Sequence, residues 1–370
     1  MPSVTAHRWD MFCQVVDNFG DIGVSWRLAC QLADEHGVTV TLWVDDLTVA
    51  KKIFRAGHPQ VQVQHWNAQS DFPEIAPVVI ETFSCGLPER YQQAMSPQTL
   101  WLNVDYLSAE DWVAGFHGRP SPQANGLVRY FIYPGFSPQT GGLLREQFLP
   151  ALKQQAEQSA QAAWRHLGVA ALPKVINVSF WCYAHAPIKG LLDSLAMSLS
   201  PSRLIVSESV AAAVAQVLAP GMLKSGQSIQ HFNCEIVVIP FLAQIDYDLL
   251  LALCDVNFVR GEDSWIRAIW AAKPMVWLPY QQSEDTHLQK LDAFRTHYLA
   301  LADDEVKAPV RSMLQAWAAG IWSDAHWRAF ISHRERITQH AKAYASQLAQ
   351  QQDLATNLVI FIEKLQKNRV

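Results

Sequence analysis

Residues 9–28 read WDMFCQVVDNFGDIGVSWRL, and residues 38–44 read VTVTLWV. The apolar run from Trp9 to Val16 is typical of a buried strand, and the apolar spacing that continues to Leu32 is typical of a helix. The second apolar run predicts another strand. A strand, a glycine-containing loop, a helix and a strand in this order form a βαβ unit, which implies a parallel α/β sheet.

The same alternation continues along both halves of the chain. Further strands are predicted at Val61–His65, Val78–Thr82, Leu100–Val104, Leu127–Tyr133, Val175–Phe180, Arg203–Ser207, Ile236–Ile239, Val256–Val259 and Pro274–Leu278. Helical patterns fall between the later strands, most clearly at Asp246–Leu253 and Ser264–Ala272, and the chain is mostly helical after Ala325.

A break in this pattern predicts two domains. Residues 145–167 are rich in the good helix formers Gln, Ala, Glu and Leu, and residues 168–173 interrupt them. A chain of 370 residues is also longer than one core usually serves. We therefore predict two Rossmann-like α/β domains, at 1–172 and 173–349, with residues 350–370 packing back onto the first domain.

Composition excludes several classes of protein. Half of the residues are hydrophobic and 17% are charged, which is a globular composition. The net charge of −5 argues against a protein that grips nucleic acid over a large surface, but not against a local basic pocket or a basic protein partner. We expect no signal peptide, because residues 1–10 include no hydrophobic segment, and no membrane span, because no apolar run is long enough. The six cysteines form no CxxC pair. We expect a cytoplasmic protein with reduced, buried thiols.

The loop after the first strand carries two carboxylates, Asp17 and Asp21, and two glycines, Gly20 and Gly23. In an open parallel sheet, ligands bind beyond the carboxyl ends of the strands, where both acids would project. The glycines would permit a tight turn and close approach of a ligand. Acids at a helix start would repel a pyrophosphate, so the pattern favours acid–base chemistry or cation binding. The alternative is that Asp21 is only a helix N-cap.

A second candidate site is the run of Arg260, Glu262, Asp263 and Ser264, which follows a predicted strand and opens a helix. The free N–H groups of a first helical turn bind anions, and an arginine can pair with a diphosphate in a forked geometry. Glu262 could bind the hydroxyl groups of a ribose or a sugar. The alternative is an ordinary capped helix with a surface ion pair.

Aromatic residues supply two weaker candidates. Trp181 and Tyr183 end the first strand of the second half, where they could stack on a base or line a sugar pocket; an aromatic core strand is the alternative. Phe241 could stack on a base, and Gln244 could bond the edge of a pyrimidine. The sequence contains no HExxH, GxSxG or P-loop motif, and we expect no metal site.

Several segments together resemble the EarP family, bacterial arginine rhamnosyltransferases that modify elongation factor P. The resemblance lies in Val15–Leu28, Leu102–Glu110, Phe131–Phe136, Thr140–Arg145 and Arg260–Ser264. It covers essentially the whole chain, and the motifs occur in the family's order. Trp181 stands where the family has a phenylalanine, and Tyr247 where another aromatic residue is usual, so both positions keep a ring.

The resemblance implies a GT-B fold, in which two Rossmann-like domains face each other across a cleft and a C-terminal helix crosses back. It implies dTDP-β-L-rhamnose as donor, inversion at the anomeric carbon, no metal cofactor, and activation of elongation factor P for relief of ribosome stalling at polyproline. The N-terminal domain would dock the acceptor and the C-terminal domain would hold the nucleotide sugar.

By position, the resemblance also implies roles for single residues. Asp21 matches the catalytic carboxylate and Asp17 the second essential acid. The residues that match the nucleotide pocket are Trp181, Tyr183, Phe241 and Gln244, and those that match the segment around the ribose and diphosphate are Arg260, Glu262, Asp263 and Ser264.

Three other functions remain to be weighed against this one. A GT-B enzyme with a small-molecule or glycan acceptor would share the donor site. A non-catalytic protein that docks on a translation factor would not need the pair Asp17 and Asp21. A dinucleotide-dependent oxidoreductase would need the GxGxxG fingerprint, which the first loop lacks.

Overall fold

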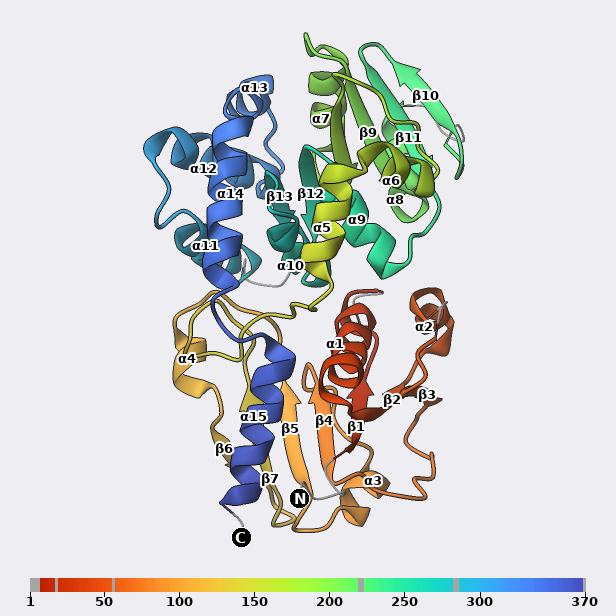
Figure 1. Cartoon of the computed structure of the whole chain (residues 1–370), viewed down its shortest axis with the longest axis vertical. Coiled ribbons are helices and arrows are strands. Elements are labelled where there is room, and N and C mark those ends of the chain that lie inside the picture. Colours follow the sequence, from red (N-terminus) through yellow and green to blue (C-terminus); the bar gives the residue numbers. More distant parts are fainter. Residues whose placement is uncertain (1–6, 17–18, 55–56, 219–222, 282–285, 369–370) are drawn as a thin grey trace. The chain divides into compact units, whose positions relative to one another are not determined.

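The computed structural model describes residues 7–16, 19–54, 57–218, 223–281 and 286–368 (Figure 1). The chain divides into two compact units, one made of residues 1–147 and 349–370 and the other of residues 148–348. Each unit is an α/β sandwich built on its own sheet.

The first unit holds a seven-stranded sheet in the order β3-β2-β1-β4-β5-β7-β6. Its strands are β1 (Arg8–Cys13), β2 (Thr39–Val44), β3 (Val61–His65), β4 (Val78–Thr82), β5 (Leu100–Val104), β6 (Pro120–Pro122) and β7 (Val128–Ile132). All neighbouring strands are parallel except β6, which pairs antiparallel with β7. The central strands β1, β4 and β5 are buried on both faces, as expected for strands of a parallel sheet.

Helices cover this sheet unequally. The helices are α1 (Gly20–His36), α2 (Leu47–Ile53), α3 (Glu89–Ala94), α4 (Trp112–Phe116) and α15 (Leu354–Lys367). Apolar residues of α1 and α15 share one core with the residues of β1, β2, β4 and β5 that point to the same face. A second cluster around Phe12, Tyr91 and Trp101 lies on the opposite face. The C-terminal helix is thus part of the core of the first unit.

The second unit holds a six-stranded sheet in the order β10-β11-β9-β8-β12-β13. Its strands are β8 (Ile176–Phe180), β9 (Ser202–Ser207), β10 (Ser228–His231), β11 (Cys234–Ile239), β12 (Val256–Arg260) and β13 (Met275–Leu278). Only β10 is antiparallel to its neighbour.

Ten helices surround this sheet in the described part of the unit. They are α5 (Leu149–Gln158), α6 (Ala160–His166), α7 (Ile188–Ala196), α8 (Glu208–Leu218), α9 (Gln244–Leu253), α10 (Asp263–Ala271), α11 (Thr286–Tyr298), α12 (Asp304–Ala318), α13 (Asp324–Ser332) and α14 (Arg334–Leu348). A buried ion pair joins α9 to α10, with Arg267 donating to both carboxylate oxygens of Asp248 at 2.9 and 2.7 Å. Two such parallel bonds fix the orientation of α10 against α9.

The structure corrects the predicted domain boundary. The second unit begins at Phe148 and not near residue 172. Residues 145–167 form two helices, α5 and α6, and both pack against α9 through a shared apolar cluster that includes Trp164 and Leu250. The break at residues 168–173 therefore marks the end of helix α6 and not the end of a domain. The short elements β6, β10, α3 and α4 were also absent from the sequence prediction.

The docking of α15 depends on a glycine. Gly142 has φ +75°, and a Cβ at this position would lie 2.5 Å from the carbonyl oxygen of Gln352, just before α15. We expect Gly142→Ala to lower the free energy of unfolding by about 3 kcal/mol, since the left-handed backbone costs about 1 kcal/mol and the clash adds to it. Urea denaturation of the variant beside the parent protein measures the loss.

Gly126→Ala is the matched control, because Gly126 lies in the same unit, has φ +81° and has open space around its Cβ position. It should lose only about 1 kcal/mol. Equal losses for the two variants would contradict the clash with Gln352.

Candidate functional site

The strand order of each sheet indicates where a ligand would bind. In the first unit the chain runs from β1 outward to β3 and then returns to the other side of β1 as β4. Ligands of open α/β sheets bind outside the carboxyl ends of the strands at this change of direction. Asp21 follows β1, Phe83 follows β4 and Tyr106 follows β5, so the three residues lie at one edge of the sheet.

Asp21 is held by groups outside its own helix. Its side chain is buried, its Oδ2 accepts the Val16 N–H at 2.8 Å, and its Oδ1 accepts the Tyr106 hydroxyl at 3.4 Å. The N-cap position of α1 is Phe19, so Asp21 sits in the first turn and is not the cap. The N-terminal end of a helix favours a negative charge at this position. The carboxylate is thus a fixed acceptor at the ligand edge.

The other residues predicted for this loop have different outcomes. Asp17 lies outside the described residues. Gly20 and Gly23 belong to the first turn of α1, and neither has a positive φ. The Gly23 N–H donates to the Phe19 carbonyl at 3.0 Å, as in an ordinary helix. Both glycines therefore lie within the helix, which begins at Gly20. The close approach of a ligand to them stays a prediction.

The segment after β4 is strained and supports Tyr106. Phe83 and Ser84 have φ +57° and +53°, a left-handed conformation that costs non-glycine residues on the order of 1–3 kcal/mol each. The Ser84 N–H donates to Asn103 Oδ1 at 2.9 Å, which holds this conformation. The Phe83 ring stacks on the Tyr106 ring, with centroids 4.4 Å apart. The strained segment thereby supports the ring whose hydroxyl reaches Asp21.

A second set of bonds fixes the backbone of Tyr106. Asn103 Nδ2 donates to Asp105 Oδ2 at 3.2 Å, and Asp105 Oδ1 accepts the Tyr106 N–H at 2.8 Å. Sequence reasoning assigned no role to Tyr106 or Phe83. Tyr106 lies inside a motif that carries the family resemblance, and this motif was the available signal. Phe83 had no such signal, because its role depends on a ring from the segment after another strand.

In the second unit, β8 and β12 flank the corresponding change of direction. Trp181 and Tyr183 follow β8, and Arg260 ends β12. Arg260 Nη1 donates to the Cys182 carbonyl at 2.9 Å, and the guanidinium lies 4.9 Å from the centroid of the Tyr183 ring. A guanidinium over a tyrosine face is stabilised by the ring's charge distribution. Arg260 and Tyr183, both predicted site residues, are therefore brought together.

The Ser264 hydroxyl bonds to the backbone of Arg260. It accepts the Arg260 N–H at 3.0 Å and donates to the Arg260 carbonyl. The hydroxyl therefore braces the end of β12. Gly261 makes the turn with φ +61°, and its carbonyl accepts the Trp277 indole N–H at 2.7 Å. Glu262 occupies the N-cap position of α10 and Asp263 is the helix's first residue, both partly buried.

The other residues predicted for the donor site are Trp181, Phe241 and Gln244, which follow strands β8 and β11 of the same sheet. The Trp181 ring packs edge-on against Tyr247, 4.9 Å away, and also contacts the core cluster around α9. The aromatic-core interpretation thus applies to part of the Trp181 side chain. Phe241 and Gln244 follow β11, and Gln244 opens α9; both are half-buried.

Two titratable side chains beside Arg260 and Tyr183 have shifted pKa values, which limit the reactions that this edge can support. The Cys182 thiol is buried, and this burial raises its pKa to about 12. The thiol therefore stays protonated at neutral pH and is a poor nucleophile. Burial, followed by the charge of His287, lowers the pKa of His185, whose ring stacks on Tyr183. His185 thus adds a mainly neutral ring to this edge at neutral pH.

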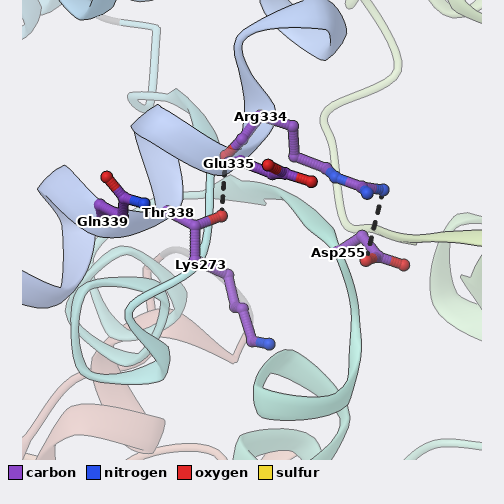
Figure 2. Close-up of a pocket in the computed structure, with 6 residues that line it drawn as sticks. All are labelled: Asp255, Lys273, Arg334, Glu335, Thr338 and Gln339. Carbon is purple, nitrogen blue, oxygen red and sulfur yellow. Dashed lines mark hydrogen bonds and ion pairs between the residues drawn. The ribbon is translucent and has the colours of Figure 1, made fainter.

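A separate pocket of about 350 Å³ lies at the amino ends of strands in the second unit's sheet (Figure 2). It is lined by Asp255, Lys273, Arg334, Glu335, Thr338 and Gln339. Arg334 Nη1 lies 3.4 Å from Asp255 Oδ1. Asp255 precedes β12 and Lys273 precedes β13, so this pocket lies at the end of the sheet opposite Arg260. It is distinct from the predicted donor site.

In the described part of the chain, one group of side chains could hold a metal ion: Glu35, His36 and Asp353. Asp353 caps α15 by accepting the Thr356 N–H at 3.0 Å, and Glu35 accepts the Gln147 N–H at 2.7 Å. These residues join the end of α1 to the start of α15, whereas Asp21 lies at the other end of α1. The group belongs to the packing of the C-terminal helix.

Comparison with known proteins decides the family. Residues 9–363 match the family described as Elongation-Factor P (EF-P) rhamnosyltransferase EarP. The chain belongs to the EarP family. It is 44% identical to a protein-arginine rhamnosyltransferase of Pseudomonas putida, over 95% of this chain and 98% of the relative. A protein-arginine rhamnosyltransferase of Pseudomonas aeruginosa is 40% identical with the same coverage.

Solved structures agree with membership of the EarP family. A structure described as the structural basis for EarP-mediated arginine glycosylation of translation elongation factor EF-P matches with a TM-score of 0.72 and 34% identity, over 96% of this chain and 99% of that chain. The spinosyn rhamnosyltransferase SpnG matches with a TM-score of 0.52 and 12% identity, over 96% of this chain and 100% of that chain, which is a likeness of fold alone. The chain is a glycosyltransferase enzyme with the GT-B fold. None of the helices in the described ranges combines the length and the apolar character that crossing a bilayer requires.

In this EarP-family enzyme, the bond from Tyr106 to Asp21 has a testable consequence. We expect Tyr106→Phe to lower kcat for sugar transfer about tenfold, because a hydrogen bond to a carboxylate is worth about 1.5 kcal/mol. Affinity for the nucleotide donor should not change. Steady-state kinetics and donor titration of the purified variant measure the two quantities.

Tyr130→Phe is a matched control, because Tyr130 packs against Phe361 of α15, on the face of the sheet that α15 covers. This variant should keep the parental kcat. If both variants lost the same activity, the hydroxyl of Tyr106 would have no special role.

Proposed function

We propose that this chain is an inverting protein-arginine rhamnosyltransferase that transfers L-rhamnose from dTDP-β-L-rhamnose to an arginine of elongation factor P. The observation that carries the proposal is the buried Asp21 carboxylate, held at the ligand edge of the first unit by Val16 and Tyr106. The names of the EarP family and of its relatives support the acceptor and the sugar. The modified factor would relieve ribosome stalling at polyproline, so we place the reaction in the cytoplasm.

The two units would divide the work. The first unit would dock elongation factor P and present its arginine to Asp21. The second unit would hold the nucleotide sugar, with the thymine and ribose near Trp181, Phe241 and Gln244. The cation–π pair of Arg260 and Tyr183 supports this division, because a fixed guanidinium suits a diphosphate and a carboxylate suits an arginine.

The leaving group sets the first chemical requirement. In a single displacement, the bond from the anomeric carbon to the diphosphate oxygen breaks while the new bond to nitrogen forms on the opposite face. Negative charge grows on the departing diphosphate. In this proposal the Arg260 guanidinium and the backbone N–H groups of the first turn of α10 stabilise that charge and no metal takes part; a single well-placed donor can contribute about 3 kcal/mol.

The nucleophile sets the second requirement. The guanidinium of arginine stays protonated at neutral pH and its lone pairs are delocalised. Asp21 would orient the guanidinium and accept a proton from the attacking nitrogen late in the displacement, when bond formation has made that nitrogen acidic. Asp17, which lies outside the described residues, would hold the remaining N–H groups or position Asp21.

The mass of the acceptor tests the proposed function directly. The purified protein is incubated with dTDP-β-L-rhamnose and elongation factor P, and the intact mass of the factor is measured. We expect a gain of one deoxyhexose that disappears when the target arginine is replaced by lysine. Donor binding without a mass change would overturn the acceptor assignment; neither binding nor transfer would overturn the function.

The variant Asp21→Asn distinguishes a role of this residue in proton transfer from a role in donor binding. The asparagine oxygen can still accept the Val16 N–H, but the amide cannot take a proton. We expect transfer to fall by a factor of 10³ or more, on the order of 4 kcal/mol, while dTDP affinity stays within about twofold of the parent. Asp46→Asn, at the N-cap of α2 in the same unit, should keep full activity. Loss of dTDP affinity in Asp21→Asn would argue against a role in proton transfer.

Ser264→Ala tests the donor site. Because the hydroxyl braces the Arg260 backbone, we expect the variant to lower kcat by about tenfold to a hundredfold and to raise the donor KM less. Ser323→Ala, at the start of α13 in the same unit, provides the control. An effect on KM alone would contradict the assignment to leaving-group stabilisation.

A further inference from the structure

Two consecutive backbone N–H groups just beyond β1 are held by carboxylates from two different elements. The Val15 N–H donates to Asp45 Oδ1 at 2.8 Å, and the Val16 N–H donates to Asp21 Oδ2 at 2.8 Å. Asp21 belongs to the first turn of α1, whereas Asp45 directly follows β2. The dipeptide Val15–Val16 therefore joins the carboxylate of the proposed site to a second carboxylate that the proposed chemistry does not use.

Asp45 lies at the ligand edge of the first unit's sheet. The parallel pairing of β1 with β2 ends at Cys13 and Val44, so Asp45 is the first residue beyond β2, beside the segment that leaves β1. Burial raises the pKa of the Cys13 thiol to about 12, and the charges of Asp21 and Asp45 act in the same direction. Both carboxylates therefore lie near the same end of β1.

The helix that follows Asp45 does not depend on it for a cap. Asp46 is the N-cap of α2, and its Oδ1 accepts the N–H groups of Thr48 and Val49 at 2.7 and 3.4 Å. Of these two adjacent aspartates, the second bonds to its own helix and the first reaches across to the segment after another strand. Helix capping, the usual role of an aspartate at this place, thus does not account for Asp45.

The backbone that Asp45 holds is fixed mainly by hydrogen bonds. The Trp66 indole N–H donates to the Cys13 carbonyl at 3.2 Å, which anchors the end of β1. The Val15 side chain packs against the core that α1 and α15 share, but the Val16 side chain is 68% exposed. Packing of its own side chain therefore cannot set the direction of the Val16 N–H, and the bond from Val15 to Asp45 is the nearest constraint on it.

We propose that Asp45 is a positioning residue for Asp21. Its carboxylate fixes Val15 so that the Val16 N–H points at Asp21 Oδ2, and this bond sets the direction in which Asp21 Oδ1 faces the acceptor. Catalytic groups work only when neighbouring groups hold them in the productive geometry. The inference rests on the proposed function and names a residue that the transfer needs, although it touches neither substrate.

Asparagine and glutamate at position 45 distinguish positioning from a role of the charge. Asp45→Asn keeps an acceptor oxygen at the same distance from the backbone, whereas Asp45→Glu keeps the charge but places its oxygens one methylene further out. In the mass assay we expect Asp45→Asn to keep kcat within about threefold of the parent and Asp45→Glu to lower it about tenfold or more. The KM values for dTDP-β-L-rhamnose and elongation factor P should stay within about twofold of the parent in both variants.

Asp46→Asn and Asp46→Glu are the matched controls, because they make the same changes at the adjacent aspartate, whose bonds go to α2. Both should keep the parental kcat. Thermal unfolding of all four variants reports whether each one retains the fold.

The reverse order, with Asp45→Glu near the parental kcat and Asp45→Asn impaired, would overturn the positioning role and assign Asp45 a role through its charge. Parental kcat in both folded variants would also overturn it, as would a change confined to KM. Loss of the fold in both would mean that Asp45 serves stability alone, which contradicts the inference. A parent protein that does not modify elongation factor P would instead refute the proposed function, and this inference with it.

Discussion

Parallel pairing of β1 with β2 on one side and β4 on the other is the constraint on which the first unit's site depends. Parallel strands end at the same edge of a sheet, so segments far apart in the chain meet there. That edge gathers Asp21, Phe83 and Tyr106 from the segments that follow three different strands. Because the N–H of Val16 and the hydroxyl of Tyr106 both donate to Asp21, the carboxylate is oriented before any ligand arrives.

Both units use the same position of an α/β sheet for opposite chemistry. In the first unit, a carboxylate accepts a bond from an aromatic hydroxyl. In the second, the guanidinium of Arg260 lies over the ring of Tyr183 and is tied to the Cys182 carbonyl. One site suits a cation and the other an anion, which are the charges of the proposed arginine acceptor and the proposed diphosphate leaving group. The fold provides the location, and the side chains provide the chemistry.

Strain and rigidity are concentrated beside the acid. Phe83 and Ser84 keep a left-handed backbone because Asn103 and the Tyr106 ring hold them there. The strained segment lowers stability, and its contact with the ring whose hydroxyl reaches Asp21 is the reason we connect it with the function of the site.

The sequence by itself determined the alternation of strands and helices, the two α/β halves and the motifs that follow β1, β8 and β12, because periodicity and turn residues act over a few positions. Only the tertiary structure decided the rest. The unit boundary at Phe148 depends on packing of α5 and α6 against α9. The support of Asp21 by Tyr106 and the bracing of Arg260 by Ser264 depend on which loops meet and how each helix begins. Such contacts join residues that local patterns cannot relate, so they are set by strand order and side-chain packing.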